Sequence, residues 1–497
     1  MTDTATVSRK EPAPVAGFDL RALCETIYPI NRSISGEGVR RTLAEMGRHV
    51  PIEITELPTG TPIFDWTVPK EWNVREAWLA GPDGRRVVDI ADHSLHLLGY
   101  STPVRERMSL AALRPHLFSL PDHPDWIPYR TSYYRENWGF CLTHRQLESL
   151  PEGDYEVCID TTLADGTMTI GEVVIPGDSD ETVLITTHTC HPSLANDNVA
   201  GLAVATALAA ELSARKSRRF TYRFVFAPGT IGAIAWIATH REQLGRIKHG
   251  LVLACMGDGG HIHYKRSRHD SAHIDRVVSH VLGRRGTRHE ILPFSPYGYD
   301  ERQYGSPGIN LPVGCLMRTP YGKYPEYHSS ADDLSFLSDA GMADSLETLR
   351  EIVDTIEIDA RYRNLNPDCE PRLGDRGLYN TNGGSNETKD IQMCHLWVLN
   401  YSDGHHSLLD IAQKSGMSLQ SASWQRHGIA GSGPAGAGLG ALNKRWRQRV
   451  GRPGKQNGRN DVPAVLFTAA PDPGTGWRLD ERAPAAGPPA IRRCFRG

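Results

Sequence analysis

Residues 187–198 read THTCHPSLANDN and decide how the rest of the chain is interpreted. An apolar, β-branched run at 183–187 leads into them, and a stretch of small and apolar residues at 199–212 with helical spacing follows. His188 and Asp197 therefore stand on a loop that leaves a buried strand, which is where open α/β sheets build their sites. Because imidazole nitrogen and carboxylate oxygen are ligands that catalytic zinc prefers, this loop predicts one half of a metal site.

The composition describes an ordinary globular protein and limits its partners. The 497 residues are enough for two or three domains, and 39% hydrophobic with 23% charged residues is typical of soluble proteins. A net charge of −3 gives no reason to expect nucleic acid or an anionic membrane as a partner. No apolar run reaches the roughly 20 residues of a membrane span, and residues 1–17 lack the apolar core of a signal peptide.

The cysteines indicate a reducing compartment. Nine of them are scattered along the chain without a CxxC pair, and an odd number does not suit a disulfide framework. We therefore expect a cytoplasmic protein with reduced thiols. The sequence leaves open whether the chain forms a homo-oligomer.

Patterns of apolar residues divide the chain into four parts. Strands alternate with helices in residues 163–365, which together with 18–60 predict one α/β domain with a mainly parallel sheet and helices on both faces. Residues 61–162 combine short strand-like runs, turns and dense aromatics, which predicts an inserted β-rich domain. Residues 366–418 are typical of the start of a winged-helix-like module. Gly, Ala, Pro and Arg crowd residues 419–497, which are either disordered or the translation of a shifted reading frame.

Three later segments, at 228–232, 255–258 and 326–333, offer further polar side chains at strand ends or in loops above the sheet. With the first loop they supply four candidate metal ligands: His188, Asp197, Asp258 and His328. Each is weak evidence alone, because a loop histidine is more often a surface residue and an aspartate before a helix is often an N-cap. Their shared placement at one edge of the sheet favours a metal site.

The order of these motifs resembles that of aminopeptidases with paired zinc ions. It resembles more closely a bacterial aminopeptidase-like family in which a β module is inserted into the zinc-peptidase fold and a winged-helix module follows. The resemblance covers roughly residues 18–418 and rests on phrases such as RSISG at 32–36, FDW at 64–66, CHP at 190–192 and DERQY at 300–304. It implies a zinc-aminopeptidase-like fold for residues 18–60 and 163–365.

The resemblance also assigns roles to single residues. It implies that His188 is a terminal ligand, that Asp197 can bridge two metals, and that His328 binds at the other metal position. Cys190 stands where di-zinc members have an aspartate that orients the first histidine. Cys255 stands where they have a metal-binding aspartate, with Asp258 as a substitute three residues later. We therefore expect one zinc ion held by His188, Asp197 and His328, with Asp258 or His191 helping, and a second ion is left open.

The general base is the main departure from the family pattern. Di-zinc members carry a Glu-Glu pair at the turn where this chain has Gly229 and Thr230. A zinc hydrolase needs a group that takes a proton from water and delivers it to the leaving amine, and glycine cannot do this. Three outcomes remain open: another carboxylate, Glu301 or Glu326, serves as the catalytic base; the enzyme is impaired; or the site binds a ligand without hydrolysing it.

Several side chains in the later loops are candidates for substrate binding. Arg302, Tyr304 and Arg318 are predicted to bind a carboxylate or sugar, since a guanidinium can fork onto such groups, with packing as the alternative. His261 and His263 are further metal-capable residues, although a solvated loop is the favoured interpretation there.

These observations and the resemblance predict a zinc-dependent, aminopeptidase-like amidohydrolase. It would remove an aminoacyl or acyl group from a small peptide-like or amino-sugar-like substrate, and the resemblance points to polysaccharide or specialised-metabolite biosynthesis. The alternative is a degenerate peptidase fold that acts as a binding or regulatory protein.

Overall fold

The computed structural model describes residues 18–373, 386–417, 419 and 467–469. It divides into two compact units, residues 1–357 and 358–497, and each is described here by itself. Among the described residues, no helix has both the length and the apolar character that crossing a membrane would require.

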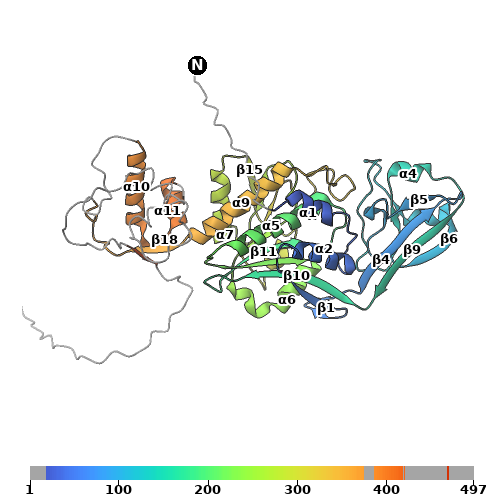
Figure 1. The fold of residues 1–497 in the computed structure, drawn as a ribbon, viewed down its shortest axis with the longest axis horizontal. Coiled ribbons are helices and arrows are strands. Elements are labelled where there is room, and N and C mark those ends of the chain that lie inside the picture. Colours follow the sequence, from blue (N-terminus) through green and yellow to red (C-terminus); the bar gives the residue numbers. More distant parts are fainter. Residues whose placement is uncertain (1–17, 374–385, 418, 420–466, 470–497) are drawn as a thin grey trace, which may run out of the picture. The chain divides into compact units, whose positions relative to one another are not determined.

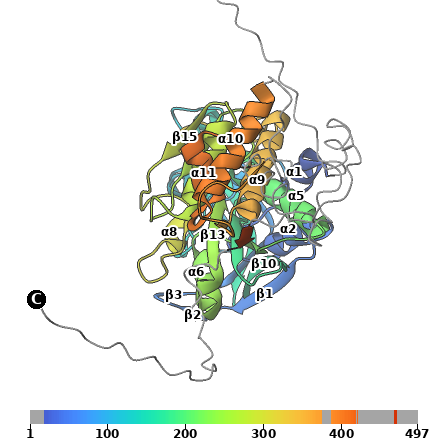
Figure 2. The same ribbon diagram turned by 90° about the vertical axis from the view of Figure 1, so that its left-hand side faces the viewer.

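The first unit is built on an eight-stranded sheet (Figures 1 and 2). Its strands follow the order β1 (Glu53–Pro58), β10 (Thr167–Ile175), β12 (Thr221–Ala227), β11 (Thr182–His188), β13 (Ile247–Leu253), β16 (Val313–Met317), β14 (Ile262–Lys265) and β15 (His289–Leu292). The four central strands, from β12 to β16, are parallel. Strands β1 and β10 on one side, and β14 next to β16 on the other, introduce antiparallel pairs, so the sheet is mixed around a parallel centre.

Helices cover both faces of this sheet, which explains its sequence. Every residue of β11 is buried, and a run of apolar and β-branched residues suits a strand that has no solvent-facing side. Figures 1 and 2 show α5 (Ala200–Ala214) and α6 (Ile231–Thr239) on opposite sides of β10. The remaining helices of this unit outside the insertion are α1 (Leu20–Ile27), α2 (Glu37–Gly47), α7 (His273–Arg284), α8 (Glu301–Tyr304) and α9 (Asp339–Ile358), with a 3-10 turn at Arg241–Arg246.

The inserted module is a four-stranded antiparallel sheet in the order β5 (Arg86–Asp89), β4 (Glu71–Ala80), β9 (Asp154–Ala164), β6 (Val104–Ser109). Two short pairs accompany it, β2 (Pro62–Ile63) with β3 (Trp66–Thr67) and β7 (Leu117–Phe118) with β8 (Phe140–Cys141). Its helical turns are Ser94–His96, α3 (Leu110–Leu113), Arg114–His116 and α4 (His144–Ser149). Trp72, Tyr100 and Phe140 belong to a buried cluster that also contains Val225 and Trp236 of the large sheet and its helix, so the two sheets share one core.

The second unit contains a three-stranded antiparallel sheet and two helices. Strand β17 (Arg361–Asn364) lies between β18 (Asp403–Ser407) and β19 (Phe467–Ala469), and the helices are α10 (Asn386–Tyr401) and α11 (Leu408–Ser415). A capping box formed by Ser407 and Asp410 starts α11, and left-handed Gly416 ends it. The first element that lies wholly within this unit is β17. The expectation for residues 419–497 lies outside the described residues, except for Leu419 and β19.

Candidate metal centre

The centre is a buried carboxylate held between two imidazoles. Nε2 of His188 lies 2.9 Å from Oδ1 of Asp197, and Nε2 of His328 lies 3.1 Å from Oδ2. His188 is the last residue of β11, while Asp197 lies in a π-helical turn (Ala195–Val199) that leads into α5. Asp197 is fully buried and His188 is 3% exposed. The structure thus brings together three of the four ligands that the sequence predicted.

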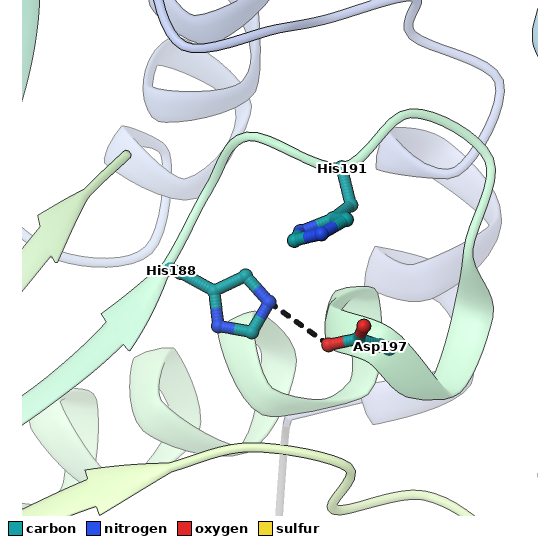
Figure 3. A group of neighbouring side chains, drawn as sticks. All are labelled: His188, His191 and Asp197. Atoms are coloured by element: carbon teal, nitrogen blue, oxygen red, sulfur yellow. Dashed lines mark hydrogen bonds and ion pairs between the residues drawn. The ribbon is translucent and has the colours of Figure 1, made fainter. Parts of the chain in front are cut away.

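A third imidazole, that of His191, completes the cluster. Its ring centroid is 4.7 Å from that of His188 and 5.2 Å from that of His328. Figure 3 shows the side chains of His188 and His191 directed toward the carboxylate of Asp197. The ligand atoms of these three residues all lie within 4.8 Å of one another. Burial holds the pKa of His191 well below its usual range, so the ring is neutral and has a lone pair available.

Neighbouring groups fix the orientation of Asp197. The Asp332 carboxylate accepts the backbone N–H groups of Asn196 at 2.6 Å and Asp197 at 3.0 Å. The Tyr299 hydroxyl donates to Oδ1 of Asp197 at 3.2 Å, and its ring stacks on that of His188 with centroids 5.1 Å apart. Outer contacts of this kind position metal ligands in proteins and tune their basicity.

The inserted module forms part of the same centre. The backbone N–H of Tyr129 donates to the carbonyl of His328 at 2.8 Å, and the Tyr129 ring meets the His328 ring edge-on at 5.0 Å. One residue earlier, Pro128 forms an isolated bridge with Ser329, and the N–H of Ile127 donates to the Ser330 hydroxyl at 2.9 Å. The loop that carries His328 is therefore held by residues 127–129.

The structure places Asp258 elsewhere than predicted. Its carboxylate accepts the Asn196 amide at 3.0 Å, the N–H and hydroxyl of Thr319 at 3.1 and 2.7 Å, and the N–H of Gly260 at 2.6 Å. These four donors use the lone pairs that a metal would need, so Asp258 ties loops together rather than joining the cluster. The sequence showed that the residue follows a strand, but it could not show where the carboxylate points.

The turn after β12 brings another carboxylate to this region. A Cβ atom at Gly229 would lie 3.5 Å from Sγ of Cys190 and 3.6 Å from Cβ of His188, which are ordinary contacts. At the next residue, the N–H of Thr230 donates to Oδ1 of Asp300 at 2.7 Å. Burial raises the pKa of Asp300 to about 6. The sequence analysis missed Asp300, although it opens the DERQY motif and directly precedes Glu301.

The two predicted catalytic glutamates differ in their surroundings. Glu301 is fully buried, and its Oε1 pairs with Nζ of Lys265 at 2.7 Å. Its carboxylate therefore compensates a buried cation. Glu326 is partly buried, two residues before His328, and its carboxylate makes no hydrogen bond or ion pair within the described part of the chain.

Of the three predicted substrate-binding residues, only Arg302 lies beside the turn. Its Nη2 is 3.4 Å from the Thr230 hydroxyl. Tyr304 is fully buried, with its hydroxyl 3.3 Å from that of Thr186, and Arg318 is 6% exposed and donates to Asp344 at 2.9 Å. Residues three apart share one face of a helix, so the face of α8 that buries Glu301 also buries Tyr304.

Comparison with known proteins finds two family models along the chain. Residues 21–359 match one described as "Domain of unknown function (DUF4910)", and residues 360–424 match a winged helix-turn-helix. A protein of Clostridium acetobutylicum named "Putative polysaccharide biosynthesis protein with aminopeptidase-like domain" is 48% identical over 404 residues, which make up 81% of this chain and 93% of that protein.

A solved structure with a similar sequence supports the same fold. A crystal structure titled "putative peptidase" from the same organism has a TM-score of 0.77 and 46% identity, and the match covers 82% of this chain and 93% of that one. A zinc aminopeptidase from Bacillus subtilis has a TM-score of 0.49 and 13% identity, with 70% of this chain and 95% of that one covered.

Proposed function

This chain belongs to the family described as "Domain of unknown function (DUF4910)", with an aminopeptidase-like fold followed by a winged-helix domain, and we propose that it is a zinc-dependent amidohydrolase. It removes an aminoacyl or acyl group from a small peptide-like or amino-sugar-like substrate. The observation that carries this proposal is the fully buried Asp197 carboxylate between His188 and His328.

The donor set fits a zinc ion. Zinc binds imidazole nitrogen and carboxylate oxygen at about 2.0–2.2 Å in tetrahedral geometry, which places neighbouring ligand atoms roughly 3.3 Å apart. The two nitrogen–oxygen separations at Asp197, 2.9 and 3.1 Å, are close to that value. One ion would be held by His188, Asp197 and His328, with His191 beside them. When bound, zinc supplies Lewis acidity to an amide carbonyl and to a water molecule.

In this proposal Asp300 is the general base that accepts the proton and later donates it. Hydrolysis adds water to the carbonyl carbon, breaks the C–N bond, and needs a group that takes a proton from water and gives it to the leaving nitrogen. Gly229 cannot do this, whereas the Asp300 carboxylate lies at the same turn. A pKa of about 6 leaves it ionised at neutral pH and still basic enough to accept a proton. Arg302, next to Thr230, is placed to bind a carboxylate or hydroxyl group of the substrate. Glu326 is the second candidate for the base.

The name of the clostridial relative supports the proposed context. It links an aminopeptidase-like domain with polysaccharide biosynthesis, so we propose an amino-sugar derivative as the substrate. We also propose a cytoplasmic location, which the free and mostly buried cysteines of the described residues support.

A second candidate function follows from Gly229 itself. Without a carboxylate at that position, the same centre can bind a metal and a ligand without turnover, and the winged-helix domain would then contact a partner. The two functions make the same prediction for metal binding and opposite predictions for hydrolysis.

The test is zinc analysis combined with hydrolysis of N-acyl and N-aminoacyl amino sugars. We expect about one equivalent of zinc at this centre in the wild type, lost in His188→Ala and kept in His49→Ala, which removes an exposed histidine. Zinc with amide cleavage supports the enzyme, and zinc without cleavage supports the binding protein. If His188→Ala binds as much zinc as the wild type, both proposed functions are contradicted.

A further inference from the structure

A second group of metal-capable side chains lies at the edge of the large sheet formed by β14 and β15. His261, His263 and Glu290 are within the described part of the chain, and their ligand atoms lie within 4.8 Å of one another. His263 is in β14, which is three strand positions away from β11 with His188 at its end. We propose that these three residues bind one divalent transition-metal ion, such as zinc, at a site separate from the centre at Asp197.

The topology explains why these residues meet. Strands β14 and β15 are parallel, and His263 stands in register with Glu290. His261 directly precedes β14, and its ring lies beside that of His263. Their ring centroids are 4.3 Å apart. The three groups therefore come from two neighbouring segments that the sheet itself holds in place.

The hydrogen bonds of His263 define which ring nitrogen has a lone pair. Nδ1 lies 3.1 Å from the carbonyl oxygen of His261. Since a carbonyl oxygen only accepts, Nδ1 must carry the hydrogen. A histidine that ligates a metal commonly donates its other N–H to such a group, and this contact fixes the ring in the orientation for binding.

The remaining nitrogen of His263 faces a carboxylate. Nε2 lies 3.2 Å from Oε2 of Glu290. If the ring is neutral, two lone pairs face each other at this distance, which requires a cation between them. The cation is either a proton on Nε2 or a metal ion bound to both atoms. The second imidazole, that of His261, favours the metal ion. A proton on Nε2 of His263 would leave the His261 ring without a role, whereas a metal ion would bind it as a third ligand.

The composition and exposure of the group suit a metal with open positions. Two imidazoles and one carboxylate are the donor set of several zinc sites and of other first-row metals. The His263 side chain is only 9% exposed and that of Glu290 is 55% exposed, so protein covers one side and solvent reaches the other. Arg288 and Arg318 both oppose a cation near His261, and the charge of Arg318 is paired with Asp344 at 2.9 Å. A bound ion would cross-link β14 to β15, a strand at the edge of the sheet.

The test compares zinc stoichiometry among variants, using competition with a chromophoric chelator. We expect two tight equivalents in the wild type, one in His263→Ala and one in Glu290→Gln. His289→Ala is the matched control, because residue 289 adjoins Glu290 and points to the opposite face of β15, and it should keep both. His188→Ala should also keep one zinc equivalent. The ion that it keeps is the one at His263, which His263→Ala removes. Equal zinc binding by the wild type, His263→Ala and Glu290→Gln overturns the proposal.

A second measurement guards against misfolding of the variants. Zinc should raise the unfolding temperature of His188→Ala, because an ion that binds only the folded protein stabilises it. It should not raise that of the double variant His188→Ala/His263→Ala. An equal shift in both proteins also overturns the proposal, whatever the outcome of the hydrolysis assay.

Discussion

Oδ1 of Asp300 accepts the backbone N–H of Thr230 at 2.7 Å, which brings a buried carboxylate to the turn where the chain has a glycine. If Asp300 is the proton acceptor, Asp300→Asn should lower the rate of amide hydrolysis by roughly 10²–10⁴-fold, the usual contribution of such a group. The base acts in its ionised form, so wild-type kcat/KM should rise as pH increases through about 6 and then level off. The variant should lose this rise and keep its zinc. If Asp300→Asn has the wild-type rate and pH profile, Asp300 is not the base, and Glu326 becomes the candidate.

Gly229 offers the reverse experiment. A Cβ at this position meets Cys190 and His188 at ordinary contact distances, so Gly229→Glu should fold and place a carboxylate beside the metal centre. We expect hydrolysis to increase at least tenfold if the centre lacks an efficient base. Gly229→Gln is the matched control, because it fills the same space without accepting a proton. An equal effect of Glu and Gln would exclude proton transfer as the cause.

The buried pair of Lys265 and Glu301 predicts a loss of stability. Both side chains are almost fully buried, with exposed fractions of 3% and 0%. Glu301→Gln removes the negative charge beside the ammonium, which keeps only the Tyr297 carbonyl at 2.6 Å. It should lower the free energy of unfolding by about 3–5 kcal/mol, measured by urea denaturation. The double variant Lys265→Met/Glu301→Leu should recover much of this loss. If Glu301→Gln keeps its stability but loses hydrolysis, Glu301 has a catalytic role after all.

Glu71 predicts an acid-dependent loss of stability. Hydrogen bonds from Arg40 lower the pKa of Glu71 from 4.5 to about 2. Because this pKa is depressed in the folded state, the stabilisation is present above about pH 4.5 and is lost as pH falls toward 2. The contribution is on the order of 2–3 kcal/mol. Glu71→Gln should therefore have a flatter dependence of unfolding free energy on pH between 5 and about 3, whereas Glu76→Gln, on the same strand with its side chain 44% exposed, should behave as the wild type.

The sequence was sufficient for those features that depend on chain order and periodicity. The buried run before His188 predicted a central strand. The shared position of His188, Asp197 and His328 at strand ends or in loops above the sheet predicted that they would meet. The α/β fold and the membership in an aminopeptidase-like family are confirmed.

The sequence was insufficient where function depends on the direction of a side chain. Asp258, Tyr304 and Arg318 lie on segments near the centre, yet each points into contacts made by residues far away in the chain. Helix α8 has only four residues, so its pattern of apolar residues is too short to show which way a side chain points. The sequence therefore could not tell that Glu301 pairs inside the core while its neighbour Asp300 faces the turn at Thr230. Only tertiary packing decides such cases.

The hydrogen bond from Tyr129 to the carbonyl of His328 has a consequence for how this protein can evolve. The two residues belong to segments that the linear sequence assigns to different domains, but we expect a substitution in residues 127–129 to act directly on the loop that carries His328. The loops at 127–129 and 326–330 therefore act as one structural unit around His328, although more than 190 positions separate them in the sequence.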